Sequence, residues 1–156
     1  MYPDAVERVL AVEPSTGARE LARKRMAGVA HPPVEFVGLD GAALPIADGD
    51  ADAVLSTFTL CTIPEIDTAM SEIVRVLRPG GALHFVEHGR SDDPKVFRRQ
   101  VRFEPIQRRI AGGCHLTRDP AELAEGVGLR VDGLARFRVQ GPKILTTMSA
   151  GRAVKE

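Results

Sequence analysis

Short apolar runs alternate with helix-like segments through the first 90 residues, and this alternation limits the possible folds more than any other feature. The runs expected to be strands are 9–12, 34–37, 52–56 and 82–86. Apolar residues recur at helical intervals over 18–29 and 64–78. Runs of this kind are typical of strands buried on both faces of a parallel sheet. The pattern therefore predicts an open α/β sheet with right-handed crossovers and helices on both faces.

The last third of the chain follows a different pattern. Residues 93–110 have helical spacing, with an interruption expected at Pro105. A short helix is predicted over 119–125, because an aspartate followed by proline is typical of a helix N-terminus. Two β-type runs, 129–139 and 144–154, are separated by a Gly-Pro turn and no helix. We therefore expect these two runs to pair antiparallel.

Length and composition indicate an ordinary globular protein. The chain has 156 residues, of which 44% are hydrophobic, and this predicts one domain over 1–156. Its 21 basic residues balance 21 acidic ones, so no overall field favours a nucleic acid. Two cysteines without metal or redox spacing, and no signal-like or membrane-spanning run, lead us to expect a reduced, cytoplasmic setting and no metal site.

Four motifs, taken in order and spacing, resemble those of class I S-adenosylmethionine-dependent methyltransferases. They are Leu-Ala-Val-Glu-Pro-Ser at 10–15, Gly-Leu-Asp-Gly-Ala-Ala-Leu-Pro at 38–45, Ala-Asp-Ala-Val-Leu-Ser at 51–56 and Val-Leu-Arg-Pro-Gly-Gly at 76–81. The segment Gly-Gly-Cys-His-Leu-Thr-Arg at 112–118 is similar to the subgroup that includes membrane-associated alkyl-thiol methyltransferases. The resemblance implies a Rossmann-like sheet, mostly parallel with an antiparallel C-terminal hairpin. It also implies methyl transfer from S-adenosylmethionine to a small-molecule acceptor.

The sequence departs from this family at its beginning. The family places a strand, a Gly-x-Gly-x-Gly loop and a helix before the strand that begins here near Val9. We therefore expect an N-terminally truncated domain that lacks about 30 residues, the length of the family's first strand, loop and helix. In the sheet, the missing strand is expected to lie between the strands formed by 9–12 and 52–56. An exposed sheet edge would favour pairing between two copies of the chain. The alternative function is accordingly a catalytically impaired fragment that acts as a dimerising or regulatory module.

The resemblance implies four cofactor-binding residues. Glu13 follows the first strand, where a carboxylate can accept hydrogen bonds from both ribose hydroxyls. Asp40 is placed to accept from the adenine amine, and Gly41 allows the ring to approach the backbone closely. Thr57 matches a position that touches the cofactor. Each assignment has a structural alternative. Glu13 would cap the following helix, Asp40 and Gly41 would form a plain turn, and Thr57 would be a surface hydroxyl.

Two histidines are the candidates for a catalytic base on the acceptor side. His88 follows the fourth strand, and His115 lies in the segment similar to the thiol methyltransferases. The alternative for each is a structural hydrogen bond. Cys114 has no partner arrangement in the sequence, so we expect it to be a packed thiol. Methyl transfer from a sulfonium itself requires in-line approach and exclusion of water rather than a metal.

A cluster of basic residues lies within the predicted helix 93–110. Its members are Lys95, Arg98, Arg99, Arg102, Arg108 and Arg109. Such a segment is typical of a lid over the acceptor or of peripheral contact with a membrane, and a solvated helix is the structural alternative. The chain has no tryptophan and one tyrosine, so it lacks the aromatic residues on which nucleic acid bases stack.

Overall fold

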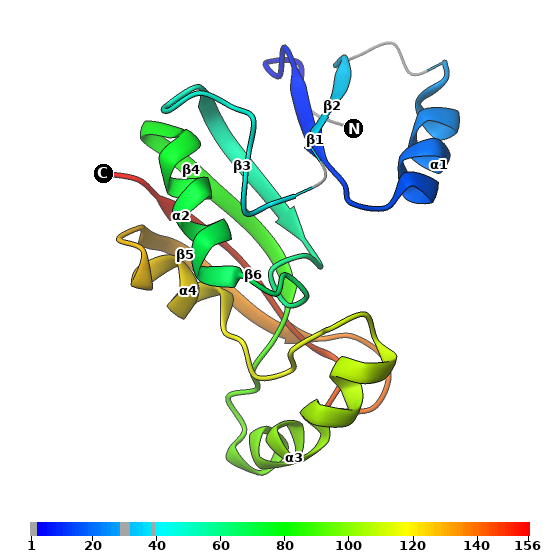
Figure 1. Ribbon diagram of the computed structural model, residues 1–156. Coiled ribbons are helices and arrows are strands. Elements are labelled where there is room, and N and C mark those ends of the chain that lie inside the picture. Colours follow the sequence, from blue (N-terminus) through cyan, green and yellow to red (C-terminus); the bar gives the residue numbers. More distant parts are fainter. Residues whose placement is uncertain (1–2, 29–31, 39) are drawn as a thin grey trace. The chain divides into compact units, whose positions relative to one another are not determined.

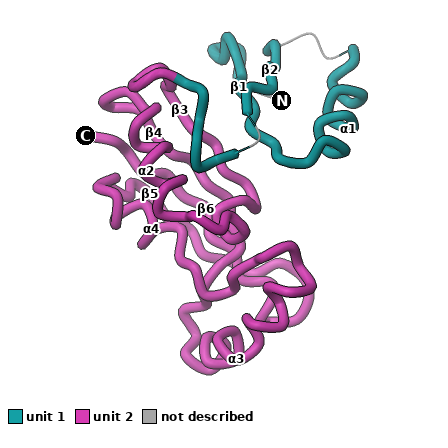
Figure 2. The backbone as a smooth tube through the Cα atoms, viewed as in Figure 1, with its two compact units in different colours: residues 1–46 teal, residues 47–156 magenta. Residues whose placement is uncertain are grey.

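The computed structural model describes residues 3–28, 32–38 and 40–156 (Figure 1). Its elements are β1 (Val9–Val12), α1 (Thr16–Met26), β2 (Val34–Gly38), β3 (Ala51–Thr57), α2 (Ile66–Val76), β4 (Leu77–His88), α3 (Pro94–Ile110), α4 (Pro120–Gly126), β5 (Arg130–Arg138) and β6 (Thr147–Val154). They form two compact units, residues 1–46 and 47–156, which are considered separately below (Figure 2). Val29 and Leu39, for which the sequence predicted helix and loop, lie outside the described residues.

Unit 1, residues 1–46, contains the parallel pair β1 and β2 joined through α1. Ser15 caps α1, because its hydroxyl accepts from the backbone N–H of Ala18 (3.2 Å). Arg19 ties the helix to the ends of both strands. Its guanidinium donates to the carbonyl of Glu13 (2.7 Å) and to that of Gly38. The same guanidinium lies 5.4 Å from the ring centre of Phe36. These contacts fix the carboxyl ends of β1 and β2 relative to the start of α1.

Unit 2, residues 47–156, contains a four-stranded sheet of order β3-β4-β6-β5. β3 and β4 are parallel, whereas β6 runs antiparallel to both β4 and β5. The predicted parallel arrangement with an antiparallel C-terminal hairpin is therefore confirmed. None of the helices in the described part of the chain is long and apolar enough to cross a membrane.

The core of unit 2 lies between one face of this sheet and the helices α2 and α4 (Figure 1). Leu83 and Phe85 alternate along β4 and are buried to 0% and 1% exposure. Met70 of α2 and Ala124 of α4 are equally buried and belong to the same cluster. Burying such side chains contributes about 1.5–3 kcal/mol each, so this layer carries most of the stability of unit 2.

The predicted end of α2 and start of β4 are wrong, as is the predicted start of the last strand at residue 144, since β6 begins at Thr147. The helix predicted over 64–78 ends at Val76, and β4 begins at Leu77 rather than at Ala82. The reason is long-range pairing: Gly80 N–H donates to the carbonyl of Lys155 (2.8 Å), so Pro-Gly-Gly continues the strand. The Lys155 ammonium also donates to the carbonyls of Val74 and Leu77 (2.7 Å each), which caps the end of α2.

The expected interruption at Pro105 is also wrong, because α3 is continuous from Pro94 to Ile110. The helix is held by side chains on the N-terminal side of the proline. Gln100, which is 0% exposed, donates to the carbonyl of Gly89 (3.1 Å). Glu104 accepts from the backbone N–H of Thr117 (2.8 Å). These contacts offset the hydrogen bond that a proline removes from a helix interior.

Both strands that should flank the missing element have an open edge. In the described residues β1 pairs with β2 alone, and β3 pairs with β4 alone. Leu55 of β3 is 59% exposed. That a strand is missing between β1 and β3 stays a prediction, because the two strands belong to different units. Whether 1–156 behaves as a single domain stays a prediction.

Candidate active site

Glu13 directly follows β1, at the carboxyl end of a parallel strand pair. It is half-buried, and its backbone N–H donates to the carbonyl of Gly38 (3.4 Å) at the end of β2. The carboxylate oxygen Oε1 accepts from the backbone N–H of Ser15 (2.8 Å). Glu13 therefore performs the capping function considered as an alternative above. A carboxylate has about four acceptor positions, so this bond leaves room for a ribose diol as well.

Asp40 and Gly41 follow β2, the neighbouring parallel strand. Asp40 is exposed, and its Oδ1 accepts from the backbone N–H of Ala42 (2.8 Å). Its carbonyl accepts from Ala43 N–H (3.4 Å), so the segment is also the Asp-Gly turn considered above. Since adjacent parallel strands end at the same edge, Glu13 and Asp40 lie at one edge of the β1–β2 pair.

Thr57 belongs to unit 2, whereas the other three predicted cofactor residues belong to unit 1. It is the last residue of β3 and is exposed, and its carbonyl accepts from the Thr59 hydroxyl (2.9 Å). Phe58, which follows it, is 62% exposed and has a positive φ of 52°. A bulky residue rarely adopts this conformation, and strained turns of this kind concentrate at functional sites.

Glu87 holds this strained turn and was not identified from the sequence. Its side chain is 0% exposed, although it is a carboxylate on the central strand β4. The Ser56 hydroxyl donates to Oε1 (2.7 Å), and the Thr59 N–H lies 3.0 Å from both oxygens. Glu87 therefore joins the end of β3 to the turn that follows it. The sequence did contain a sign of this role, because Glu87 directly follows the strand-like run 82–86. A carboxylate is rarely buried in such a strand without hydrogen-bonding partners.

His88 contacts Cys114 and a backbone carbonyl. Its Nε2 donates to the carbonyl of Leu145 (2.6 Å), and its Nδ1 faces Cys114 Sγ at 3.3 Å. The hydrogen bond with Cys114 raises the pKa of His88 although burial acts against it. The expectation that Cys114 lacks a partner is wrong, because residues 26 positions apart meet only in the fold. With both ring nitrogens engaged, His88 has the structural role considered above.

His115 has a different partner, and its pKa moves in the opposite direction to that of His88. Its Nδ1 lies 3.3 Å from Glu104 Oε1, and its side chain is 20% exposed. Burial, followed by the positive charges of Arg118 and Arg108, lowers the pKa of His115. If Nδ1–H faces the carboxylate, Nε2 carries the lone pair of the neutral ring. His115 therefore has the properties of a base oriented by a carboxylate, as in other acid–base pairs.

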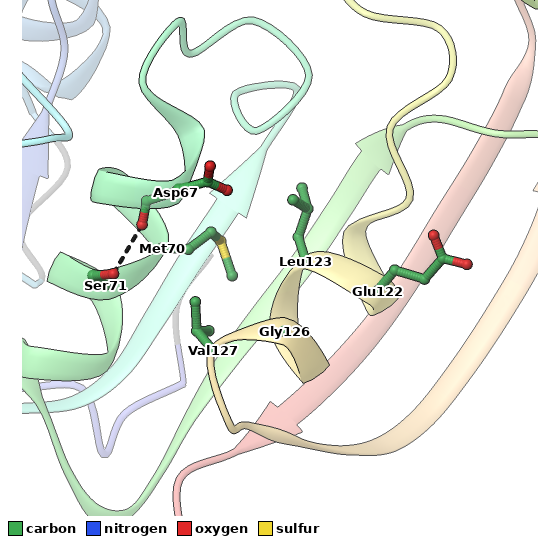
Figure 3. Close-up of a pocket in the computed structure, with 7 residues that line it drawn as sticks. All are labelled: Asp67, Met70, Ser71, Glu122, Leu123, Gly126 and Val127. Carbon is green, nitrogen blue, oxygen red and sulfur yellow. Dashed lines mark hydrogen bonds between the residues drawn. The ribbon is translucent and has the colours of Figure 1, made fainter.

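Two surface hollows in the described part of unit 2 differ in their linings. One, of about 370 Å³, is lined by Pro105, Arg108, Arg109 and Gly113, next to the segment that carries His115. The other, of about 420 Å³, lies between α2 and α4. Met70, Leu123 and Val127 point toward the space between these helices (Figure 3). The first hollow contains two members of the predicted basic cluster, Arg108 and Arg109.

Comparisons with known proteins agree with this arrangement. The methyltransferase domain family matches residues 1–85. The human thiol S-methyltransferase TMT1B is 36% identical over 121 residues, covering 76% of this chain and 49% of that protein. The demethylmenaquinone methyltransferase of Renibacterium salmoninarum is 36% identical over 86 residues, covering 55% of this chain and 34% of that protein. The chain thus spans about half the length of the thiol methyltransferases it matches.

Solved structures show the same fold at low sequence identity. A SAM-dependent methyltransferase from Methanosarcina mazei has a TM-score of 0.69 and 19% identity, covering 95% of this chain and 82% of that one. A SAM-dependent methyltransferase from Aquifex aeolicus has a TM-score of 0.63 and 15% identity, covering 94% of this chain and 69% of that one. The strand-end placement of the site and the match over 1–85 lead to one assignment: the chain belongs to the class I methyltransferase domain family.

Proposed function

We propose that the protein transfers a methyl group from S-adenosylmethionine to a small-molecule acceptor, and that the acceptor is a thiol. The observation that carries the proposal is the position of Glu13 and Asp40 after neighbouring parallel strands, within the part of the chain that matches the family. The choice of a thiol is based on the relatives. The match to thiol methyltransferases spans 76% of the chain, so it includes residues after 85, where the match to the general methyltransferase family ends. The matches to quinone methyltransferases are shorter, at 51–58%.

The residues after β1 and β2 suit the nucleoside part of S-adenosylmethionine. Glu13 would accept from the ribose hydroxyls while it keeps the Ser15 hydrogen bond, and Asp40 would accept from the adenine amine beside Gly41. Thr57 at the end of β3 stays a sequence-based prediction for the same role, since it belongs to unit 2. When bound, S-adenosylmethionine supplies an electrophilic methyl group, so the chain has to orient the acceptor and exclude water.

His115 is the base in this proposal, and His88 is a structural residue. A thiol must lose its proton before or during attack on the methyl carbon, and a neutral imidazole can take it at Nε2. Glu104 would orient the ring through Nδ1 and stabilise the imidazolium that forms. Arg108 and Arg109, which line the adjacent hollow, would attract an acceptor that carries a negative group.

The test is methyl transfer from isotopically labelled S-adenosylmethionine to mercaptoacetate, with glycolate as the matched oxygen acceptor. We expect the label in the thioether only. His115→Gln should lower kcat by about 10²-fold to 10⁴-fold, the usual contribution of a positioned general base. Raising the pH toward the thiol's own pKa should restore part of the loss. A rate unaffected by His115→Gln would contradict the role of His115.

One specific observation favours the second candidate, a dimerising or regulatory module. The β3 edge is open in the described residues, and Leu55 and Phe58 beside it are 59% and 62% exposed. Sedimentation of the chain over a range of concentrations distinguishes the two functions. A stable dimer without methyl transfer to either acceptor would support the module, whereas methyl transfer to the thiol would support the enzyme.

A further inference from the structure

Cys61 and Cys114 meet beside His88 in unit 2, although 53 positions separate the two cysteines in the sequence. The backbone N–H of His115 donates to the carbonyl of Cys61 (2.8 Å), which brings the two cysteine-bearing segments side by side. Adjacent backbones are what a disulfide requires, since its Cα atoms are typically about 5.5–6 Å apart. Both cysteines are present as thiols.

The two thiols differ in their surroundings. Cys114 lies 3.3 Å from His88 Nδ1, whereas the acidic side chain of Glu87 acts on Cys61. The hydrogen bond from Cys61, followed by that from His88, lowers the pKa of Cys114 to about 5. The hydrogen bond with Cys114 and burial raise the pKa of Cys61. These opposite directions make Cys114 the more acidic thiol and the nucleophile of the pair.

Cys114 lies closer to solvent than Cys61, although both are buried. It is 8% exposed, against 3% for Cys61. The residue before it, Gly113, lines the hollow formed with Arg108 and Arg109. Gly112 and Gly113 have φ values of 57° and 87°, a conformation that glycine adopts readily. Of the two cysteines, Cys114 is therefore the one beside a surface hollow.

We propose that Cys114 is a modification site for hydroperoxides and that Cys61 resolves the modified thiol into a Cys61–Cys114 disulfide. In the first step the Cys114 thiolate attacks the peroxide, an S–O bond forms and the O–O bond breaks. The leaving oxygen takes the proton from His88, and Cys114 becomes a sulfenic acid. In the second step the Cys61 sulfur attacks Cys114 and the S–O bond breaks. The departing hydroxide takes the Cys61 proton as water, so two thiols are oxidised and one peroxide is reduced.

This proposal is independent of methyl transfer and concerns residues that the proposed mechanism does not use. The cysteine pair rests on the contacts of His88 with Cys114 and of His115 with Cys61. The charged groups facing the pair are Glu87 on β4 and Arg118, whose charge acts on Cys61.

The first test is peptide-level mass spectrometry of the intact 156-residue chain after treatment with one equivalent of hydrogen peroxide. We expect a reductant-sensitive crosslink between the peptides that contain Cys61 and Cys114. In Cys61→Ser, we expect a dimedone adduct at Cys114 instead, because the sulfenic acid cannot be resolved. Cys114→Ser should leave Cys61 unmodified. A chain that keeps both thiols unmodified under these conditions would overturn the proposal.

The second test uses the unmodified chain and therefore does not depend on how the variants fold. The rate at which iodoacetamide alkylates Cys114 should be nearly constant between pH 6.5 and 8.5. An ordinary thiol gains on the order of 50-fold over the same interval as it ionises. A 50-fold rise at Cys114 would overturn the proposed thiolate, and equal labelling of Cys61 would overturn its role as the resolving thiol.

Discussion

Replacing Glu87 with alanine is expected to lower the free energy of unfolding of unit 2 by about 3–5 kcal/mol. The carboxylate is 0% exposed, and it accepts from the Ser56 hydroxyl and the Thr59 backbone N–H. Truncation leaves the buried Ser56 hydroxyl and the part-buried Thr59 N–H without this acceptor, and it opens a cavity beside β4. Each charge-assisted hydrogen bond is worth about 1.5–3 kcal/mol, and the cavity adds to the loss.

Urea unfolding followed by circular dichroism measures this effect. Glu87→Gln keeps the shape and one carbonyl acceptor, so we expect it to lose about half as much stability. Glu125→Ala removes an exposed carboxylate from α4 and should change the stability by less than about 0.5 kcal/mol. Equal stability of Glu87→Ala and Glu125→Ala would show that the buried carboxylate does not hold the turn after β3.

The second large effect concerns cofactor affinity. Glu13→Gln is expected to weaken the binding of S-adenosylhomocysteine by about 30-fold to 100-fold, since two charge-assisted hydrogen bonds to the ribose become neutral ones. The amide oxygen can still accept from the Ser15 N–H, so the capping contact at α1 is retained. The substitution therefore separates the binding role of Glu13 from its structural role. Calorimetric titration measures the ratio of dissociation constants.

Glu20→Gln is the matched control, because Glu20 is an exposed carboxylate of α1 whose side chain is paired with Lys24 (2.9 Å). It removes the same charge from the same helix and should leave affinity unchanged. If both variants bind equally well, the carboxylate after β1 is only a helix cap. If Glu13→Gln also unfolds at lower urea concentration than Glu20→Gln, part of the lost affinity reflects a loosened helix start.

The arrangement of strands could be predicted because it depends on local patterns. The apolar runs at 9–12 and 34–37 and the helical spacing of α1 and α2 each require only neighbouring residues to be recognised. The order of the motifs also predicted that a strand is missing between β1 and β3, which stays a prediction because the two strands belong to different units. Glu13 and Asp40 were placed correctly at strand ends for the same reason.

The boundaries and buried contacts could not be predicted because they depend on residues distant in sequence. Lys155 determines where α2 ends through contacts with Val74 and Leu77, about 80 positions away. Thr117 helps to hold α3 straight across Pro105 through Glu104. The pairing of His88 with Cys114 likewise exists only after β4 and the loop following α3 come together. Secondary-structure propensities are assigned to each segment separately, so they do not include these long-range contacts.

The most direct test of the central claim is an NMR titration of the 156-residue chain with S-adenosylhomocysteine, followed through the backbone amides. The account predicts saturable one-site changes concentrated at 13–15 and 40–42, the segments that follow β1 and β2. Further changes are expected at 57–59, where Glu87 fixes the turn after β3. A folded chain whose amides do not respond to millimolar ligand, or respond only outside these segments, would contradict the assignment of this strand-end site to the cofactor.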